Sequence, residues 1–309
     1  MKLISIVSGA YNEEDNISEL YLQVSKIIQK FPHYDFEQII IDNFSTDRTR
    51  DILRQLSAEN PKFKVILNTR NFGHVRSPYY GVLQASGDAV IYLASDLQDP
   101  PKYIEDFIIK WEEGYKIVFG IKNQSEEFPV FFIARKIYYW FVSKLSDVPL
   151  IQNSTGFGLY DKSVIDVVRK IDDPYPYLRG LICEIGFPIA QIPFVQPRRK
   201  RGITKNNFYT LYDVAMLGIT SHSKIPLRLA TMFGFLMSLV LFLIALIYFV
   251  LKLVLWDTFA LGLAPLLIGI FFLGSIQLFF IGILGEYIGA IYTQVLKRPL
   301  VIEEERINF

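Results

Sequence analysis

The hydrophobic pattern divides the chain into a long region of short apolar runs and a C-terminal region with two long ones. The long runs, Leu229–Leu251 and Thr258–Gly285, carry no charged residue, and each exceeds the roughly 20 residues that a helix needs to cross a bilayer. They predict two transmembrane helices. The alternative is a helical hairpin buried in a soluble protein, which would need a very large core to hide stretches of this length.

Before these runs, short stretches rich in Ile, Val and Phe alternate with segments whose apolar residues recur at helical spacing. Such alternation is typical of an α/β fold with a mostly parallel sheet and right-handed crossovers. Ligands of such sheets bind beyond the carboxyl ends of the strands, where polar clusters occur at 11–15, 42–47 and 95–99. The predicted strands are Leu3–Ser8, Phe36–Asp42, Phe63–Asn68, Ala89–Ala94 and Lys116–Ile121, and the predicted helices are Glu14–Lys30, a helix capped by Ser45, Pro78–Ala85, and a helix from Pro100 to near Gly114.

Two further segments are rich in aromatic residues. Val130–Lys144 is crowded with Phe, Tyr and Trp and punctuated by Arg135, Lys136 and Lys144, and Phe208–Leu217 leads toward the first long run. We interpret both as helices lying in a membrane interface, with ordinary core helices as the alternative.

Charge and composition indicate which classes of partner are excluded and in which compartment the protein works. The net charge of +1 gives no general attraction to nucleic acid. The single cysteine, Cys183, excludes an internal disulfide and fits a reducing compartment, and with only three histidines a zinc site is not expected. No secretory signal is recognised after Met1, and the outer flanks of the long runs are basic, so we expect both termini in the cytoplasm and the hairpin tip outside. The flanking basic residues are Lys224, Arg228, Lys297 and Arg298.

The expected organisation therefore has four parts. A cytoplasmic head at 1–207 is followed by a juxtamembrane amphipathic segment at 208–228, two transmembrane helices within 229–290 and a cytoplasmic tail at 291–309.

Acidic residues after two predicted strands are the first candidates for chemistry. Asp96, Gln98 and Asp99 follow the fourth strand, and oxygen ligands of this kind suit Mg²⁺ or Mn²⁺ when substrate phosphates complete the shell. Asp42 ends the second strand, where an acidic residue can hold a ribose or a base. Both have plainer alternatives, since acidic turn residues before proline are common and Asp42 can instead cap a helix.

The basic segment 198–205 is a second candidate site. It holds five Arg and Lys residues together with Gly202 and Thr204, a combination that can neutralise a pyrophosphate and let the backbone approach it. Alternatively, it is a polybasic tether to the membrane surface or a solvated charge run. No G-x-G-x-x-G follows the first strand and no Walker lysine motif occurs, which argues against a dinucleotide oxidoreductase or a P-loop enzyme.

Taken in order, these motifs resemble inverting glycosyltransferase family two. More narrowly, with two C-terminal spans, the chain is similar to the polyisoprenyl-phosphate glycosyltransferases, which include dolichyl-phosphate mannose synthase and the bactoprenol glucosyltransferases. The resemblance covers the head and the hairpin. The motifs are S-I-V-S-G-A-Y-N-E-E-D-N-I (Ser5–Ile17), I-I-I-D-N-F-S-T-D (Ile39–Asp47), R-N-F-G-H (Arg70–His74), S-D-L-Q-D-P-P (Ser95–Pro101) and R-K-R-G-I-T-K (Arg199–Lys205).

The resemblance implies a GT-A fold and metal-dependent transfer of a sugar, with inversion, from a nucleotide sugar to polyprenyl phosphate on the cytoplasmic leaflet of the inner membrane. UDP-glucose or another UDP-hexose is the favoured donor, undecaprenyl (bactoprenyl) phosphate the favoured acceptor, and modification of cell-surface glycans the expected purpose. By position in the motifs, the nucleotide-sugar residues would be Ala10, Tyr11, Asn12, Glu13, Asp42, Asn43, Ser95 and Lys205; the metal ligands Asp96 and Gln98; the catalytic residues Asp96 and Arg199; and the lipid-phosphate residues Arg135, Thr155, Gly156 and Phe157.

The chain departs from the family pattern at several positions. Ala94 stands where the first Asp of D-x-D is usual, and Asn43 stands where a second Asp is common. Members with G-D-F-R have Asp and Arg where this chain has Gly156 and Gly158. We infer retained activity with altered handling of the donor.

Two alternative functions remain. One is a processive polysaccharide synthase of the same superfamily, although its Q-x-x-R-W motif is missing. The other is a non-catalytic membrane scaffold, which Ala94 and Asn43 motivate. Five glycines in and just after the second long run would allow close helix packing within the hairpin or between protomers: Gly269, Gly274, Gly282, Gly285 and Gly289. A homo-oligomer, tetrameric in some family members, is among the expected partners.

Overall fold

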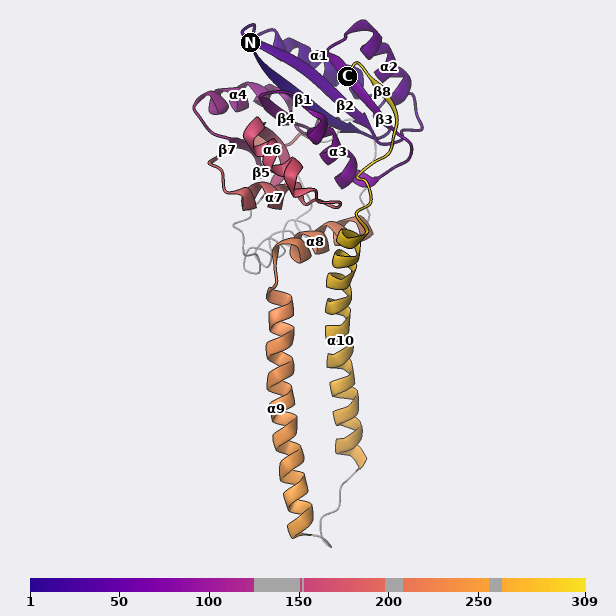
Figure 1. Ribbon diagram of the computed structural model, residues 1–309, viewed down its shortest axis with the longest axis vertical. Coiled ribbons are helices and arrows are strands. Elements are labelled where there is room, and N and C mark those ends of the chain that lie inside the picture. The colour runs from indigo at the N-terminus through magenta and orange to yellow at the C-terminus, as the bar shows by residue number, and fades with distance from the viewer. Residues whose placement is uncertain (125–150, 152, 198–207, 256–262) are drawn as a thin grey trace.

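The computed structural model describes residues 1–124, 151, 153–197, 208–255 and 263–309. It has a globular head from which two long helices extend side by side (Figure 1). The elements are β1 (Lys2–Ala10), α1 (Ile17–Ile28), β2 (Tyr34–Asp42), α2 (Thr49–Glu59), β3 (Phe63–Asn68), α3 (Gly73–Gln84), β4 (Ala89–Tyr92), η1 (Pro101–Tyr103), α4 (Ile104–Glu112), β5 (Ile117–Gln124), β6 (Ser154–Asp161), α6 (Lys162–Ile171), α7 (Leu178–Ile185), β7 (Ile189–Val195), α8 (Phe208–His222), α9 (Ile225–Val254), α10 (Leu263–Leu296) and β8 (Glu303–Ile307).

The strands of the head form one sheet in the order β7-β5-β6-β4-β1-β2-β3-β8. β1 pairs in parallel with β2 and β4, and β2 pairs in parallel with β3. β6 runs antiparallel to both β4 and β5, and β8 runs antiparallel to β3. The prediction of an α/β head with a mostly parallel sheet, followed by a hairpin of two apolar helices, is confirmed.

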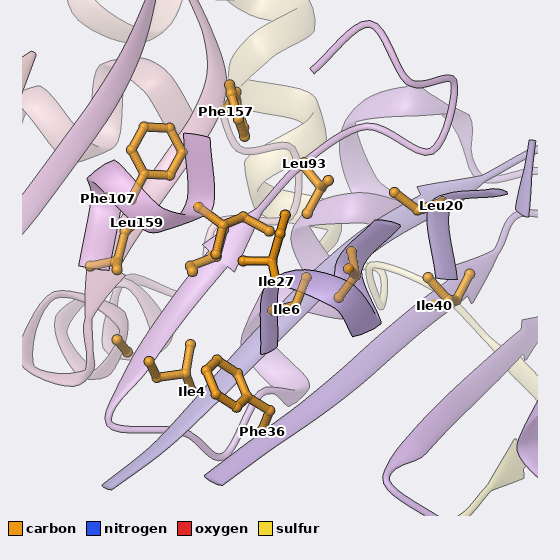
Figure 2. Packing of buried hydrophobic residues seen from close by; sticks show 14 of the residues in the cluster. Ile4, Ile6, Leu20, Ile27, Phe36, Ile40, Leu93, Phe107, Phe157 and Leu159 are labelled. Carbon is orange, nitrogen blue, oxygen red and sulfur yellow. The ribbon is translucent and has the colours of Figure 1, made fainter. Parts of the chain in front are cut away.

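Successive side chains of a strand point to opposite faces of the sheet, so both faces carry apolar residues. Helices cover both of these faces. Ile4 and Ile6 of β1 are fully buried against α1 and α4, as Figure 2 shows. Val7 and Ile39 are buried on the other face, against α3, α6 and α7. A slip of one residue would turn these apolar side chains to the wrong face, so packing fixes the register and with it the rim where β1, β2 and β4 end.

Several local predictions differ from the structure. Ser45 does not cap a helix: α2 begins at Thr49, and the Ser45 hydroxyl instead accepts a hydrogen bond from the Asn12 backbone N–H (2.8 Å). The helix expected from Pro78 begins earlier, at Gly73, with the proline inside it. β6, β7 and β8 were not predicted. The proposed interface helix 130–144 and the basic segment 198–205 lie outside the described residues.

The hairpin helices are long and apolar enough to cross a membrane. The most apolar 18-residue stretch has a mean hydropathy of 2.8 in α9 and of 2.2 in Ile268–Leu296 of α10, and no residue is buried in either stretch. The alternative of a hairpin hidden in a soluble core therefore does not hold, and the helices indicate membrane association. An added Cβ would meet nothing within 4 Å at Gly269, Gly274 and Gly282 in the described chain, so these glycines do not bring α9 and α10 together.

After α10, the chain returns to the head. β8 pairs with β3, Val65 opposite Ile307, and the Thr69 backbone N–H donates to the Ile302 carbonyl (3.0 Å). The yellow C-terminal segment beside β3 in Figure 1 is this return. Residues expected to form a separate tail thus belong partly to α10, which ends at Leu296, and partly to the sheet of the head.

Candidate functional site

Two loops at the carboxyl ends of β1 and β2 are joined by hydrogen bonds. The Asn12 backbone N–H donates to Ser45 Oγ (2.8 Å), and the Thr46 backbone N–H donates to Asn12 Oδ1 (2.7 Å). Asn12 has a φ of 55°, a left-handed conformation that Asn adopts more readily than most residues. The predicted pocket residues 10–13 thus lie in one braced turn beside the end of β2.

Asp42, the last residue of β2, is fully buried. Its Oδ2 accepts from the Ser45 backbone N–H (3.0 Å) and from Arg50 Nε (2.8 Å). Among the described residues, Oδ1 has no hydrogen-bond partner. A buried unpaired acceptor is unfavourable unless a ligand or water satisfies it, so this oxygen fits a donor group of a ribose or a base.

Asn43 serves the neighbouring loop instead. Its Oδ1 accepts from the Phe72 backbone N–H (2.8 Å), and its Nδ2 donates to Asn71 Oδ1 (2.9 Å) and to the Gly73 carbonyl (3.1 Å). The amide thereby holds the R-N-F-G loop ahead of α3. An Asp at this position would accept from Phe72 but would donate to neither oxygen.

The loop after β4 carries the predicted metal ligands. Ser95 Oγ donates to the Gly9 carbonyl (2.7 Å), which fastens the loop to β1. Asp96 Oδ1 accepts from the Gln98 backbone N–H (3.1 Å), and Leu97 between them has a φ of 61°. The turn thus sets Asp96 and Gln98 close together.

These residues fit a hard cation only in part. A carboxylate and an amide oxygen suit Mg²⁺ or Mn²⁺, but they leave most of the coordination shell to other donors. In the described part of the chain, no group of three or more His, Cys, Asp or Glu is arranged to hold a metal ion. The donor set therefore matches a metal that arrives with a phosphate-bearing ligand.

Asp99, in the same loop, joins this turn to β6. Its Oδ2 accepts from the Ala94 backbone N–H (3.0 Å), and Thr155 Oγ1 lies 3.5 Å from its Oδ1. Burial, with a smaller contribution from the charge of Asp96, raises the pKa of Asp99 to about 7. Ala94, where a family Asp is usual, contributes its backbone to this contact.

A cavity of about 150 Å³ lies between α3, β6 and the start of α7. His74, Tyr92, Gly156, Tyr177 and Arg179 are among the residues that line it. Arg179 Nη1 donates to the carbonyl of Ser154 (2.8 Å), and its guanidinium carbon lies 5.1 Å from the centre of the Tyr177 ring. The cavity thus combines apolar walls with a positive charge that is held in a fixed position.

This cavity lies on the side of the head that meets the hairpin. Tyr175, close along the chain to Tyr177, lines a second cavity with residues of α8 and α10. Gln294 of α10 donates to Asp173 (2.8 Å), and Tyr212 of α8 donates to Glu286 of α10 (2.7 Å). The segment 173–177 therefore connects the cavity to the long helices.

β6 carries three of the residues predicted to meet a lipid phosphate. Thr155 and Gly156 line the cavity, and Gly156 has a φ of +90°, a conformation that disfavours side chains. The Phe157 ring is fully buried and packs on Phe107 with 4.7 Å between ring centres (Figure 2). The structure thus brings two of the three to the cavity and the third into the core.

Three other predicted site residues, Arg135, Arg199 and Lys205, lie outside the described residues. His74 and Arg179 were not singled out from the sequence. His74 lies inside the R-N-F-G-H motif, which was a signal for it, whereas nothing in the sequence around Arg179 marked that residue.

Comparison with known proteins defines the class. Residues 5–165 match the family described as glycosyl transferase family 2. The chain belongs to this family, and its three-layer head, with one antiparallel strand inserted between β4 and β5, has the GT-A fold.

Full-length relatives narrow the class. The chain is 33% identical over 302 residues to the bactoprenol glucosyl transferase of Shigella phage SfII, covering 97% of this chain and 96% of the relative. It is 33% identical over 303 residues to the uncharacterized glycosyltransferase YkcC of Bacillus subtilis, covering 97% and 93%. The resemblance to polyisoprenyl-phosphate glycosyltransferases is confirmed.

Solved structures resemble the head more distantly. Glucosyl-3-phosphoglycerate synthase from Mycobacterium tuberculosis, in complex with Mn²⁺, UDP and glucosyl-3-phosphoglycerate, has a TM-score of 0.46 and 20% identity. The match covers 71% of this chain and 78% of that one.

Proposed function

We propose that this protein transfers a monosaccharide from a nucleotide sugar to a polyprenyl phosphate at the cytoplasmic surface of the inner membrane, with inversion at the sugar. UDP-glucose is the favoured donor and undecaprenyl phosphate the favoured acceptor. Relatives named bactoprenol glucosyl transferase, which match over nearly the whole chain, support glucose as the sugar and a bactoprenyl lipid as the acceptor.

The observation that carries this proposal is the position of two different sites near one rim. The Asp42 and Asp96 loops follow β2 and β4 and suit a polar donor. The cavity at Arg179 and Gly156 lies beside them, on the side of the head that contacts α8 and α10. Thr155, which lines this cavity, contacts Asp99 of the donor loop, so the two sites are adjacent.

The cavity suits a phosphate at the end of an apolar chain. Arg179 supplies a cation already oriented by its bond to Ser154, and Tyr92 and Tyr177 supply apolar walls. An approach from the membrane side would let the lipid chain stay in the apolar phase.

The chemistry then needs little from side-chain acids or bases. The bond between sugar C1 and the donor's diphosphate oxygen breaks, and the nucleoside diphosphate leaves with the electron pair, while an acceptor phosphate oxygen bonds to C1 from the opposite face. A phosphate monoester has a second pKa of about 6, so this oxygen is already anionic near neutral pH. Alignment of the two substrates is therefore the main task of the protein.

The remaining task is to stabilise the leaving group. Asp96 and Gln98 would hold Mg²⁺ or Mn²⁺, which neutralises charge on the departing diphosphate when bound. Arg199 and Lys205 would add positive charge from the basic segment.

Asp96→Ala tests this assignment. We expect transfer of radiolabelled glucose from UDP-glucose into the lipid fraction of membranes to fall by about a hundredfold or more, because the variant loses the carboxylate that would hold the metal. Asp106→Ala is the matched control, since Asp106 is an exposed carboxylate on α4, and its transfer rate should equal that of the wild type.

The same assay separates the alternatives. Label in a polymer instead of lipid would indicate a processive synthase. A wild-type chain that transfers no label from UDP-glucose, UDP-N-acetylglucosamine or GDP-mannose would favour the scaffold. Turnover of Asp96→Ala at the wild-type rate would falsify the role of Asp96.

A further inference from the structure

The strand that closes the sheet after the hairpin places two acidic side chains against α2. Glu304 Oε2 accepts from Arg50 Nη1 (2.9 Å), and Glu305 Oε2 accepts from Arg54 Nη2 (2.8 Å). The two pairs have similar lengths and come from neighbouring residues of β8. The pairs differ in the other hydrogen bonds that each arginine makes.

Arg50 is shared among three elements. Besides Glu304, its Nε donates to Asp42 Oδ2 (2.8 Å) and its Nη2 to the carbonyl of Asn68 at the end of β3 (2.6 Å). Its side chain is 16% exposed and that of Asp42 is 0% exposed, so the shared guanidinium is largely removed from water. Charge-assisted bonds of this kind are about twice as strong as neutral ones.

The way in which Arg50 contacts Asp42 matters for the candidate donor site. A guanidinium can hold a carboxylate with two parallel hydrogen bonds, which would occupy both carboxylate oxygens. Here Nη1 of Arg50 donates to Glu304 and Nη2 to Asn68, and these two bonds orient the guanidinium so that Asp42 receives a hydrogen bond only from Nε, at Oδ2. Oδ1 stays without a partner among the described residues.

Loss of Glu304 would free Nη1 of Arg50. The guanidinium could then rotate to present its Nη1 and Nη2 edge to Asp42 and take Oδ1 as well, which would remove the acceptor left for a nucleoside. Loss of Glu305 would release only Arg54, whose exposed side chain contacts Asp51 and Glu305 but not Asp42.

We propose that Arg50, held by Glu304 of β8, is a positioning residue that keeps Asp42 Oδ1 available to a nucleoside diphosphate, so that the strand following the membrane hairpin sets the donor affinity of the head. This inference rests on the proposed function, because it takes the ligand of Asp42 to be the nucleoside of the donor. It makes the C-terminal strand part of the donor site although none of its residues is assigned to that site.

Glu304→Gln and Glu305→Gln form a matched pair for the test. Each removes one negative charge and one charged contact between β8 and α2. The probes are UDP and GDP, titrated calorimetrically into the full-length chain in detergent. For the nucleotide that the wild type binds, we expect Glu304→Gln to weaken binding about five- to tenfold, the effect of one hydrogen bond, and Glu305→Gln to change it less than about twofold.

Steady-state kinetics give a second readout that a general loss of stability would not produce. Glu304→Gln should raise the KM for the nucleotide sugar by a similar factor and leave kcat within about twofold, because binding and not the chemical step is affected. Arg50→Lys should weaken nucleotide binding further, since an ammonium group cannot serve all three acceptors, whereas Arg54→Lys should not.

The outcomes separate the two claims. If the wild type binds UDP or GDP and the two Gln variants bind equally well or equally badly, the role of β8 is wrong and the proposed function stands. If the wild type binds neither nucleotide with or without Mn²⁺, the proposed function fails and the inference fails with it.

Discussion

Asp161, at the end of β6, is a single carboxylate that serves three elements. It caps α6 by accepting from the Ser163 backbone N–H (3.0 Å), and it accepts from Trp111 Nε1 of α4 (2.8 Å) and from Lys116 Nζ (3.1 Å). Burial alone would raise the pKa of Asp161, but the bonds from Ser163, Trp111 and Lys116 outweigh it and lower the pKa to about 2. The charged form therefore stabilises the head.

This shift predicts a pH dependence of stability. The folded pKa lies below the ordinary value of 3.8, so the contribution is complete above pH 3.8 and is lost as the pH falls toward 2. Asp161→Asn should lower the free energy of unfolding by about 1–2 kcal/mol at pH 7, with a difference from wild type that narrows below pH 4. Thermal unfolding of the detergent-solubilised chain between pH 7 and 3 measures this.

Asp166→Asn is the control, since Asp166 is a more exposed carboxylate of α6 that pairs with Arg169 at 2.7 Å. Its effect should stay below about 0.5 kcal/mol. A constant offset between wild type and Asp161→Asn over the whole pH range would contradict the role of the Asp161 charge.

At the scale of elements, β6 does the most to shape the candidate site. It lies between β4 and β5 and brings Thr155 and Gly156 to the cavity. At Gly158, β6 approaches β5 so closely that an added Cβ would lie 2.2 Å from the Val118 carbonyl oxygen. Position 158, where some family members have Arg, therefore has no room for a side chain in this strand.

Gly158→Ala should accordingly weaken the sheet. We expect a loss of about 1–3 kcal/mol in the free energy of unfolding, because the obstacle is backbone and not a movable side chain. The apparent melting temperature in detergent measures it. Gly234→Ala on α9 is the comparison, since nothing within 4 Å would meet its Cβ in the described chain. Equal melting temperatures for the two variants would show that β6 and β5 can move apart.

The elements also show which parts of the fold the sequence could reveal. The five predicted strands are rich in Ile, Val and Phe because both of their faces are buried, and such runs stand out. β6 reads S-T-G-F-G-L-Y-D, with small residues among its apolar ones, and β8 reads E-E-E-R-I, so neither has a continuous apolar run. Their places depend on backbone pairing with partners distant in the chain.

The candidate site divides in the same way. Residues 10–13, Asp42 and Asp96 could be placed on one rim because each follows a predicted strand. His74 and Arg179 come from the starts of α3 and α7, and only tertiary packing brings them together. The sequence also does not predict where a side chain points. Asn43, for example, points to the R-N-F-G loop.

At the scale of the whole molecule, the head is attached to the hairpin twice, before α8 and again through β8. Because β1 and β8 belong to one sheet, both ends of the chain must lie on the same side of any membrane that α9 and α10 cross. This agrees with the basic flanks of the two apolar runs.

Cysteine labelling tests this arrangement in bacterial cells that express a Cys183→Ser chain. Lys252→Cys, near the hairpin tip, should react with a membrane-impermeant maleimide in intact cells. Glu59→Cys on α2 and Ile302→Cys ahead of β8 should react only after the membrane is permeabilised. Labelling of Lys252→Cys and Ile302→Cys to the same extent in intact cells would contradict the topology.

The pairing of β8 with β3 also bears on the order in which the protein is made. Arg50 and Glu304 are 254 residues apart, so the ribosome completes the last strand long after the rest of the head has emerged. Until then β3 is an open edge, which is prone to pair with other chains. A nascent chain thus seals its sheet only once both apolar helices have been synthesised, which ties the maturation of the head to the insertion of its anchor.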